Sequence, residues 1–205
     1  ETVSLSSAGA NFATTKLIVR SSDLAVCRPS TQARLFWMAF LVFGVGLSIS
    51  IVPWTGDFSL DDLFPILFGV VFGGVGLAAL LNARRFVFDR RTGLLTETKG
   101  AFGWYRRIGE RKLDDIEAVQ LCSRYQSGGE APAYMVYQIN LVFAGPGDDR
   151  LNLTSHAGEK QVRAEAEVLA GFLGKPLLDH TLKDDAPKNL GQFISAFSNH
   201  WKKRR

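Results

Sequence analysis

Three histidines and three pairs of adjacent aspartates are the side chains of this sequence best suited to metal binding or acid–base chemistry. The histidines are far apart and none has the spacing of a known metal motif, so we predict surface or helix-capping roles for them: His156, His180 and His200. Each aspartate pair falls in a predicted turn, where aspartate bonds the local backbone: Asp114-Asp115, Asp148-Asp149 and Asp184-Asp185. We therefore predict no metal site and no catalytic residue.

The two cysteines, Cys27 and Cys122, lack a CxxC context, and we predict free thiols in strands for both. The sequence has no glycine-rich phosphate loop and no GxSxG motif, so no cofactor or small-molecule substrate is expected. No helix-turn-helix, zinc-finger or basic-aromatic RNA-binding pattern is present, which argues against nucleic acid as a partner.

Two uncharged blocks, Leu35–Trp54 and Leu63–Leu81, determine the class of protein. Each block extends about 30 Å as a helix, which matches the thickness of the hydrocarbon core of a bilayer. A buried core helix is the alternative, but such helices usually carry a polar face, and neither block has one. We predict a transmembrane hairpin over residues 35–82, with spans at 35–54 and 63–82. Because the spans contain no ionisable side chain, they offer no haem ligand, proton relay or charged substrate site.

The charges that flank the spans predict the orientation of the hairpin. The connection Pro53–Asp62 carries three aspartates and no Lys or Arg, whereas six arginines flank the other ends of the spans: Arg28, Arg34, Arg84, Arg85, Arg90 and Arg91. Positively charged flanks remain on the cytoplasmic side. We therefore expect both termini in the cytoplasm, and four membrane-interface anchors: Arg34, Arg84, Arg85 and Trp54.

Small residues recur at a spacing of four within both spans. Gly44 and Ser48 share one helix face, and so do Gly69 and Gly73, which permits close approach of helix backbones. Two interpretations remain open. The two spans pack on each other through these stripes, or one stripe receives a helix of another protein.

The polar remainder of the chain predicts an antiparallel β domain with one helix, giving an α+β membrane protein. The helix, residues 157–173, has an apolar face of Val162, Ala166, Leu169 and Leu173, a cap at Thr154 or Ser155, and ends at Gly174 and Pro176. The expected strands are Phe12–Arg20, Leu24–Arg28, Arg85–Asp89, Leu94–Lys99, Phe102–Lys112, Ile116–Arg124, Tyr134–Phe143 and Arg150–Leu153.

A helical hairpin followed by the segments RRFVFDRRTGLLT and RKLDDIEAVQL and a terminal helix resembles bacterial membrane proteins with a pleckstrin-homology-like domain. The resemblance covers about residues 35–178 and implies a bacterial inner-membrane protein with a PH-like domain closed by its C-terminal helix. It also implies a role in assembly, interaction or envelope maintenance. The chain then has four parts: an N-terminal cytoplasmic segment with a β-hairpin (1–34), the hairpin (35–82), the PH-like domain (83–178) and a basic amphipathic tail (179–205). Residues 12–28 lie outside the resemblance and are expected to add strands to the cytoplasmic sheet.

The tail combines an apolar helical face with a basic end. The face comprises Leu190, Phe193, Ile194, Phe197 and Trp201, and the basic end comprises Lys202, Lys203, Arg204 and Arg205. Such a helix can lie in the lipid head groups, dock into a groove of a partner protein or pack on its own domain.

Three functions follow from these features, in order of preference. The first is a non-catalytic accessory or scaffold subunit of a larger membrane complex, for example an energy-transducing one, in contact with the lipid bilayer and other membrane subunits. The second is a membrane-anchored module that binds or senses anionic lipid. The third is an enzyme whose residues match no known motif.

Overall fold

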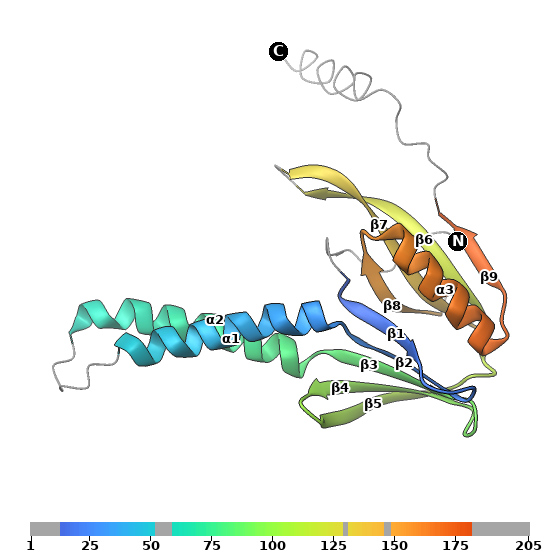
Figure 1. Ribbon diagram of the computed structural model, residues 1–205, viewed down its shortest axis with the longest axis horizontal. Coiled ribbons are helices and arrows are strands. Elements are labelled where there is room, and N and C mark those ends of the chain that lie inside the picture. The colour runs from blue at the N-terminus through green and yellow to red at the C-terminus, as the bar shows by residue number, and fades with distance from the viewer. Residues whose placement is uncertain (1–12, 52–58, 129–130, 146–148, 182–205) are drawn as a thin grey trace, which may run out of the picture.

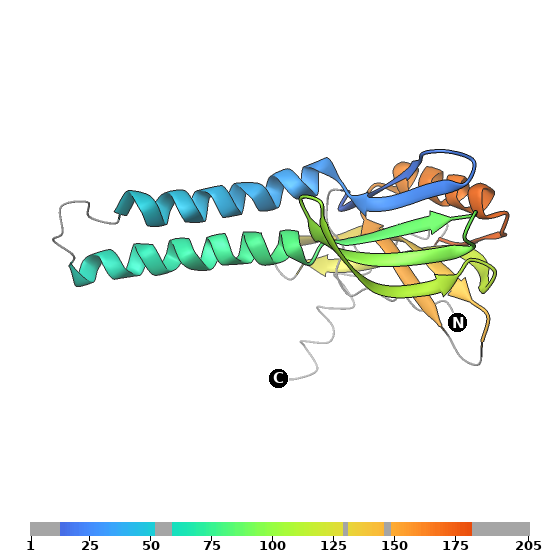
Figure 2. The ribbon, with the colours of Figure 1, turned by 90° about the horizontal axis from the view of Figure 1, so that it is seen from below.

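The chain is an α+β protein in which a long helical hairpin extends from one end of a β domain (Figures 1 and 2). The computed structural model describes residues 13–51, 59–128, 131–145 and 149–181. Its elements are β1 (Thr15–Val19), β2 (Leu24–Pro29), α1 (Thr31–Ile51), a short 3-10 turn η1 (Leu60–Asp62), α2 (Leu63–Leu81), β3 (Arg84–Asp89), β4 (Leu94–Ala101), β5 (Trp104–Lys112), β6 (Ile116–Gly128), β7 (Ala131–Phe143), β8 (Arg150–His156), α3 (Glu159–Leu173) and β9 (Leu177–His180).

Nine strands in the described residues form two sheets. The first sheet has the order β1-β2-β3-β4-β5 and is antiparallel throughout. The second has the order β8-β7-β6-β9, in which only the β6–β9 pair is parallel. The prediction of a mostly antiparallel β domain is confirmed. The eight expected strands are present with somewhat different ends, whereas β9 was not expected.

The helical hairpin is inserted between two paired strands of one sheet. Leu24 pairs with Asp89 and Cys27 with Phe86, so β2 and β3 are antiparallel neighbours although α1 and α2 separate them in sequence. The expectation that residues 12–28 add strands to the sheet is confirmed. Consequently the predicted boundary between an N-terminal segment, 1–34, and a separate domain, 83–178, does not divide the fold, because both contribute to the same sheet. The predicted tail boundary at residue 179 also falls inside β9.

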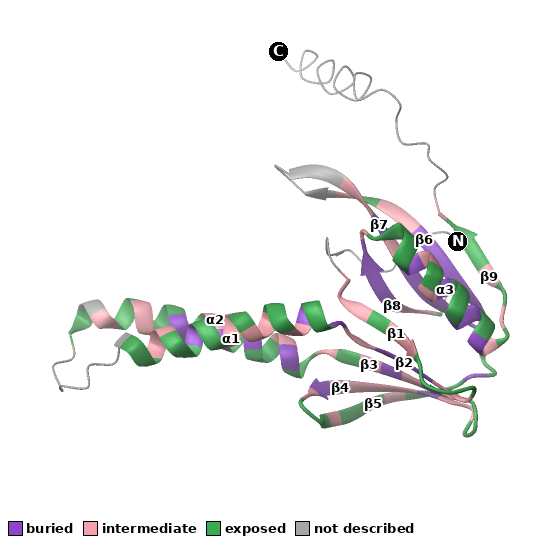
Figure 3. Cartoon of the chain, viewed as in Figure 1, coloured by how far each residue is buried: buried purple, intermediate pink, exposed green. Residues whose placement is uncertain are grey.

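One continuous hydrophobic core joins both sheets to α3 (Figure 3). Phe86, Phe88 and Leu95 come from the first sheet, and Leu121 and Leu141 from the second; each is no more than 2% exposed. The apolar face predicted for α3 enters this core through Val162, Ala166 and Leu169, while Leu173 is only partly buried. Burial of this face holds the helix against the sheets.

The C-terminal end of α3 agrees with the prediction, whereas its N-terminal cap does not. Gly174 ends the helix in a left-handed conformation with φ 65°, as expected, and the Lys175 N–H donates to the Ala170 carbonyl at 3.1 Å. The predicted cap at Thr154 or Ser155 is wrong, because both residues belong to β8 and Gly158 occupies the N-cap position. The β8 strand continues to His156 because it stays paired with β7 to that point.

Both helices of the hairpin are long and apolar enough to cross a membrane. α1 begins four residues earlier than the predicted span, at Thr31, where the Ser30 hydroxyl accepts a hydrogen bond from the Ala33 N–H at 3.0 Å. Asp62 occupies the N-cap position of α2, but its carboxylate accepts hydrogen bonds from the Ser59 N–H and hydroxyl at 2.9 Å and makes none to the α2 backbone.

Candidate functional site: the helical hairpin and its junction with the β domain

The small residues of the two helices face each other inside the hairpin. A methyl group added to Gly69 would lie 2.7 Å from the Gly44 carbonyl oxygen, and one added to Gly44 would lie 2.6 Å from the Gly73 Cα. The Ser48 hydroxyl donates to the Gly44 carbonyl at 3.0 Å and lies 3.4 Å from the Ile66 carbonyl across the interface. Both stripes are used within the hairpin, which leaves neither open to a helix of another protein.

Because the small residues point inward, the large apolar side chains point outward. Only 11% of the residues in the apolar window of α1 and 22% of those in α2 are buried, as the mostly green and pink helices in Figure 3 show. The exposed set includes Leu35, Val42, Phe43, Ile49, Phe64, Leu67, Val70, Val71 and Val75. A core helix of a water-soluble domain would instead bury such residues.

Phenylalanines gather along one side of this apolar surface. Phe40 stacks on Phe72 across the two helices with ring centroids 5.4 Å apart, and Phe68 follows at 4.4 Å from Phe72. Phe43 and Phe64 extend the row through contacts with Phe72 and Phe68. We call Phe40, Phe43, Phe64, Phe68 and Phe72 the phenylalanine row. Phe43 and Phe64 remain 55% and 76% exposed, so the row presents aromatic surface away from the hairpin.

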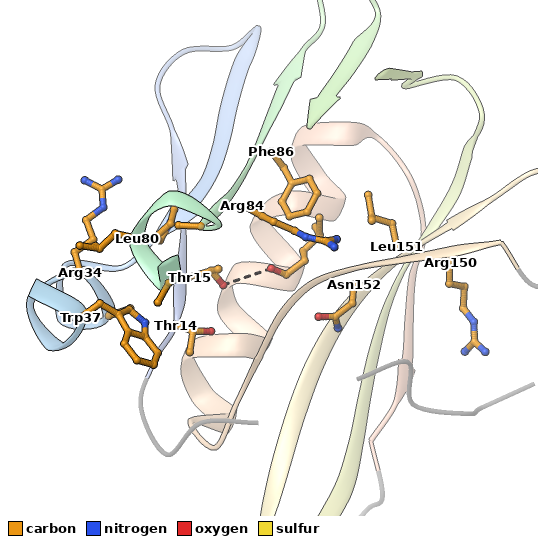
Figure 4. Close-up of a pocket in the computed structure, with 15 residues that line it drawn as sticks. Thr14, Thr15, Arg34, Trp37, Leu80, Arg84, Phe86, Arg150, Leu151 and Asn152 are labelled. Atoms are coloured by element: carbon orange, nitrogen blue, oxygen red, sulfur yellow. Dashed lines mark hydrogen bonds between the residues drawn. The ribbon is translucent and has the colours of Figure 1, made fainter. Parts of the chain in front are cut away.

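A cavity of about 750 Å³ lies where the hairpin joins the β domain (Figure 4). Six elements contribute to its wall, through residues that include Thr15 of β1, Pro29 of β2, Trp37 of α1, Leu80 of α2, Phe86 of β3 and Asn152 of β8. The Thr15 hydroxyl lies 3.5 Å from the Leu153 carbonyl, which ties β1 to β8 at the cavity wall. The wall is therefore apolar at the helices and more polar toward β8.

Three arginines line the same cavity without converging on one point. Arg34 lies on α1, Arg84 starts β3 and Arg150 starts β8, and their guanidinium groups point in different directions (Figure 4). Arg84 forms an ion pair with Glu97 at 3.2 Å, and Arg150 donates to the Gln120 side chain at 3.3 Å. The cavity thus has cationic groups around it and does not form a single anion-binding centre.

The predicted membrane-interface anchors are only partly brought together. Arg34 and Arg84 both line the cavity. The Arg85 guanidinium instead lies 5.1 Å from the centre of the Tyr105 ring on the first sheet. Trp54 lies outside the described residues, and so does the predicted tail contact set from Leu190 to Arg205. Sequence reasoning missed Trp37, Arg150 and Asn152 as cavity residues, because only the packing of the second sheet against the first places β8 beside the hairpin.

Of the two roles predicted for His156, surface or helix-capping, the surface position is wrong because the residue is buried in the β domain. It is 1% exposed, and its Nδ1 atom accepts a hydrogen bond from the Gly158 N–H at 3.1 Å, at the start of α3. Burial lowers the pKa of His156, which keeps the ring neutral. His180 is exposed on β9, and His200 lies outside the described residues. Within the described residues no three His, Cys, Asp or Glu side chains lie close enough to share a metal ion.

Both cysteines are free, buried and in strands, as predicted. Cys27 lies in β2 and Cys122 in β6. Burial raises the pKa of Cys27 to about 12, and it also raises the pKa of Cys122. A buried thiol of raised pKa carries little thiolate, so neither side chain is prepared for nucleophilic chemistry.

Comparison with known proteins yields no match to any protein-family model. No curated protein matches the chain either.

Proposed function

We propose that this protein is a two-pass membrane protein whose hairpin crosses the bilayer and holds the β domain at one membrane surface. The observation that carries the proposal is the inside-out arrangement of the hairpin. Gly44, Gly69, Gly73, Gly76 and Ser48 lie between the helices, and leucine, valine and phenylalanine side chains lie outside. Exposing this much contiguous apolar surface to water is unfavourable, at about 25 cal/mol per Å². Lipid acyl chains remove that cost.

The β domain then lies on the cytoplasmic side of a bacterial inner membrane. Both ends of the hairpin connect to adjacent strands of one sheet, so they emerge on the same side. Arg34 and Arg84 line the cavity at this end of the hairpin. The connection Pro53–Asp62 between the helices has three aspartates and no basic residue. Arginine-rich flanks favour the cytoplasmic leaflet.

Within the membrane we propose an accessory or scaffold role without catalysis, in which the hairpin contacts a helix of another membrane subunit. Because the glycine stripes are used inside the hairpin, the contact surface is the phenylalanine row. Exposed rings supply large contact areas at little cost in side-chain entropy, and aromatic pairs add about 0.5–1.5 kcal/mol each. The resemblance to bacterial membrane proteins with PH-like domains stays a prediction and agrees with this role.

Site-specific photo-crosslinking in native membranes tests the proposal. A photoreactive phenylalanine analogue at Phe68 should crosslink one defined membrane protein after irradiation. The same analogue at Val70 is the matched control, since Val70 is equally apolar and 57% exposed but lies about 200° around the same helix. Purification in mild detergent as a monomer with no crosslinked or co-purifying protein would contradict the scaffold role. Release of the protein from membranes by alkaline carbonate would contradict the membrane crossing itself.

Anionic-lipid binding is the second candidate, and the arginine-lined cavity favours it. Arg34, Arg84 and Arg150 surround an opening at the level where the helices leave the bilayer. The expected result is that vesicles of phosphatidylglycerol stabilise the purified protein more than vesicles of phosphatidylcholine. Replacing Arg34 and Arg84 with glutamine should remove the difference if the cavity is responsible. Replacing Lys202–Arg205 with neutral residues should remove it if the tail is responsible.

A further inference from the structure

The turn between β4 and β5 has an unusual residue at its tip. Ala101 pairs with Trp104, so the loop between the strands consists of Phe102 and Gly103 only. Both have positive φ, 53° and 92°, as a type I′ hairpin turn requires. Such turns favour asparagine, aspartate or glycine at the first position, and a bulky residue there costs about 1–2 kcal/mol. The phenylalanine is therefore unfavourable for the turn itself.

Packing among the described residues does not offset this cost. Phe102 is 68% exposed and the neighbouring Trp104 is 86% exposed, the highest value for any large apolar side chain in the described residues. Two aromatic side chains therefore project together from the tip of one hairpin. The contacts that stabilise them must come from outside the described fold.

The tip lies beside the point where α2 ends (Figures 1 and 2). The Gly100 N–H donates to the carbonyl of Ala83, just after α2, at 3.1 Å. Leu81, the last residue of α2, lines a shallow pocket together with Trp104 and Tyr105. The aromatic tip is thus fixed to the end of the hairpin, at the depth where an apolar helix leaves the acyl chains.

Basic side chains stand directly behind the tip. Lys99 on β4 pairs in register with Arg106 on β5, and both line the same pocket as Trp104. Arg107 follows, in an exposed ion pair with Glu110 at 2.7 Å. From the tip toward the β domain, aromatic rings come first and cationic groups second. A membrane surface has the matching order, since Trp-rich interfacial layers adjoin the hydrocarbon core and anionic phosphates lie farther out.

We propose that the β4–β5 turn inserts Phe102 and Trp104 into the head-group region of the bilayer that the hairpin crosses. Together with α1 and α2 it forms a third attachment point, which fixes the rotation of the β domain on the membrane surface. Lys99 and Arg106 contact the lipid phosphates. This proposal rests on the membrane crossing proposed above and adds a lipid-contact site that is separate from both the cavity and the C-terminal tail.

A fluorescence experiment on the full chain in vesicles of phosphatidylglycerol and phosphatidylcholine tests the site. The reporter is a nitrobenzoxadiazole dye on Phe102→Cys, which can be attached selectively because the native cysteines are buried. Lipids carrying a nitroxide at the head group should quench this dye about twofold or more. The matched control is Ile108→Cys, an exposed position four residues from Trp104 on the same strand, which should be quenched little. Trp104→Cys supplies a second reporter if Phe102→Cys fails to fold.

A dye on Val71→Cys, in the middle of α2, separates failure of this proposal from failure of the membrane crossing. Suppose that acyl-chain nitroxide quenches the Val71 dye but head-group nitroxide quenches neither the Phe102 nor the Trp104 dye. The proposed insertion of the β4–β5 turn is then wrong, while the membrane crossing of the hairpin stands. No quenching at Val71 would overturn both. If neither lipid nitroxide nor aqueous dithionite quenches the Phe102 dye, the insertion of the turn is also wrong, and a protein contact covers the tip instead.

Discussion

Gly44 and Gly73 lie so close across the hairpin that a methyl group on Gly44 would overlap the Gly73 backbone, with the Gly73 Cα only 2.6 Å away. Backbone atoms cannot yield as a flexible side chain does, so Gly44→Ala should separate the helices and cost about 1–3 kcal/mol. Thermal unfolding of the purified protein in mild detergent measures the loss. Gly46→Ala is the matched control, since nothing lies within 4 Å of its added methyl group. Equal midpoints for the two variants would contradict this packing.

Gly100 should be equally intolerant of a side chain, for a different reason. Its φ of 143° disfavours any other residue, and an added methyl group would overlap the Trp104 carbonyl and lie 3.1 Å from the Tyr105 Cα. Gly100→Ala is expected to cost about 2 kcal/mol or more in the free energy of unfolding. Gly109→Ala on the adjacent strand should change it by only about 0.5 kcal/mol, because its methyl group meets Glu97 at ordinary contact distances. Denaturant titration of both variants provides the comparison.

Stability should fall in mild acid because of His156. Burial lowers its pKa in the folded protein, so below the ordinary value of 6.5 the unfolded chain binds a proton that the folded chain does not. The stabilisation is present above that value and is lost as the pH falls. Protonation of Nδ1 also breaks the bond from Gly158, worth about 1 kcal/mol. His156→Gln should flatten the stability profile between about pH 7 and 5, and an unchanged slope would show that another group is responsible.

A second acid-sensitive contact joins β9 to α3. Partial burial opposes ionisation of Asp179, but hydrogen bonds from Arg163 and Thr181 outweigh it and lower the pKa of Asp179 to about 2. The stabilisation is therefore present above the ordinary value of 3.8 and is lost as the pH falls through about 2. The pair is about a third exposed, so Asp179→Asn should cost only about 0.5 kcal/mol at neutral pH. Amide hydrogen exchange of β9 should accelerate in the variant, with exchange of β3 unchanged.

The thiols of Cys27 and Cys122 should not react with alkylating reagents in the folded protein. With the Cys27 pKa raised to about 12 by burial and the negative charge of Glu165, almost no thiolate is present near neutral pH. A maleimide reagent at about pH 7 should label neither Cys27 nor Cys122 in detergent, and should label both after denaturation. Rapid labelling of one cysteine in the folded state would show that its strand opens locally.

Several features of this fold could be predicted from short stretches of sequence. Gly174 was expected to end the helix of residues 157–173, and it ends α3 with φ 65°. Val162, Ala166 and Leu169 were expected on one apolar face of that helix, and all three are buried. These features depend on residues a few positions apart, where glycine chemistry and the helical repeat act directly. The cap predicted at Thr154 or Ser155 was wrong because both residues belong to β8, whose pairing with β7 is a long-range contact.

The two long apolar helices, the amphipathic α3 and most of the strands can be predicted from local sequence, because charge patterning and hydrophobic period are properties of the local chain. The pairing of β2 with β3 across the helical hairpin and the contact of Gly44 with Gly73 are established by the tertiary structure. It also decided that Arg34, Arg84 and Arg150 surround one cavity, and that Phe102 and Trp104 project beside the end of α2. These long-range contacts depend on which side chains far apart in sequence are buried together, and local structural preferences do not predict that.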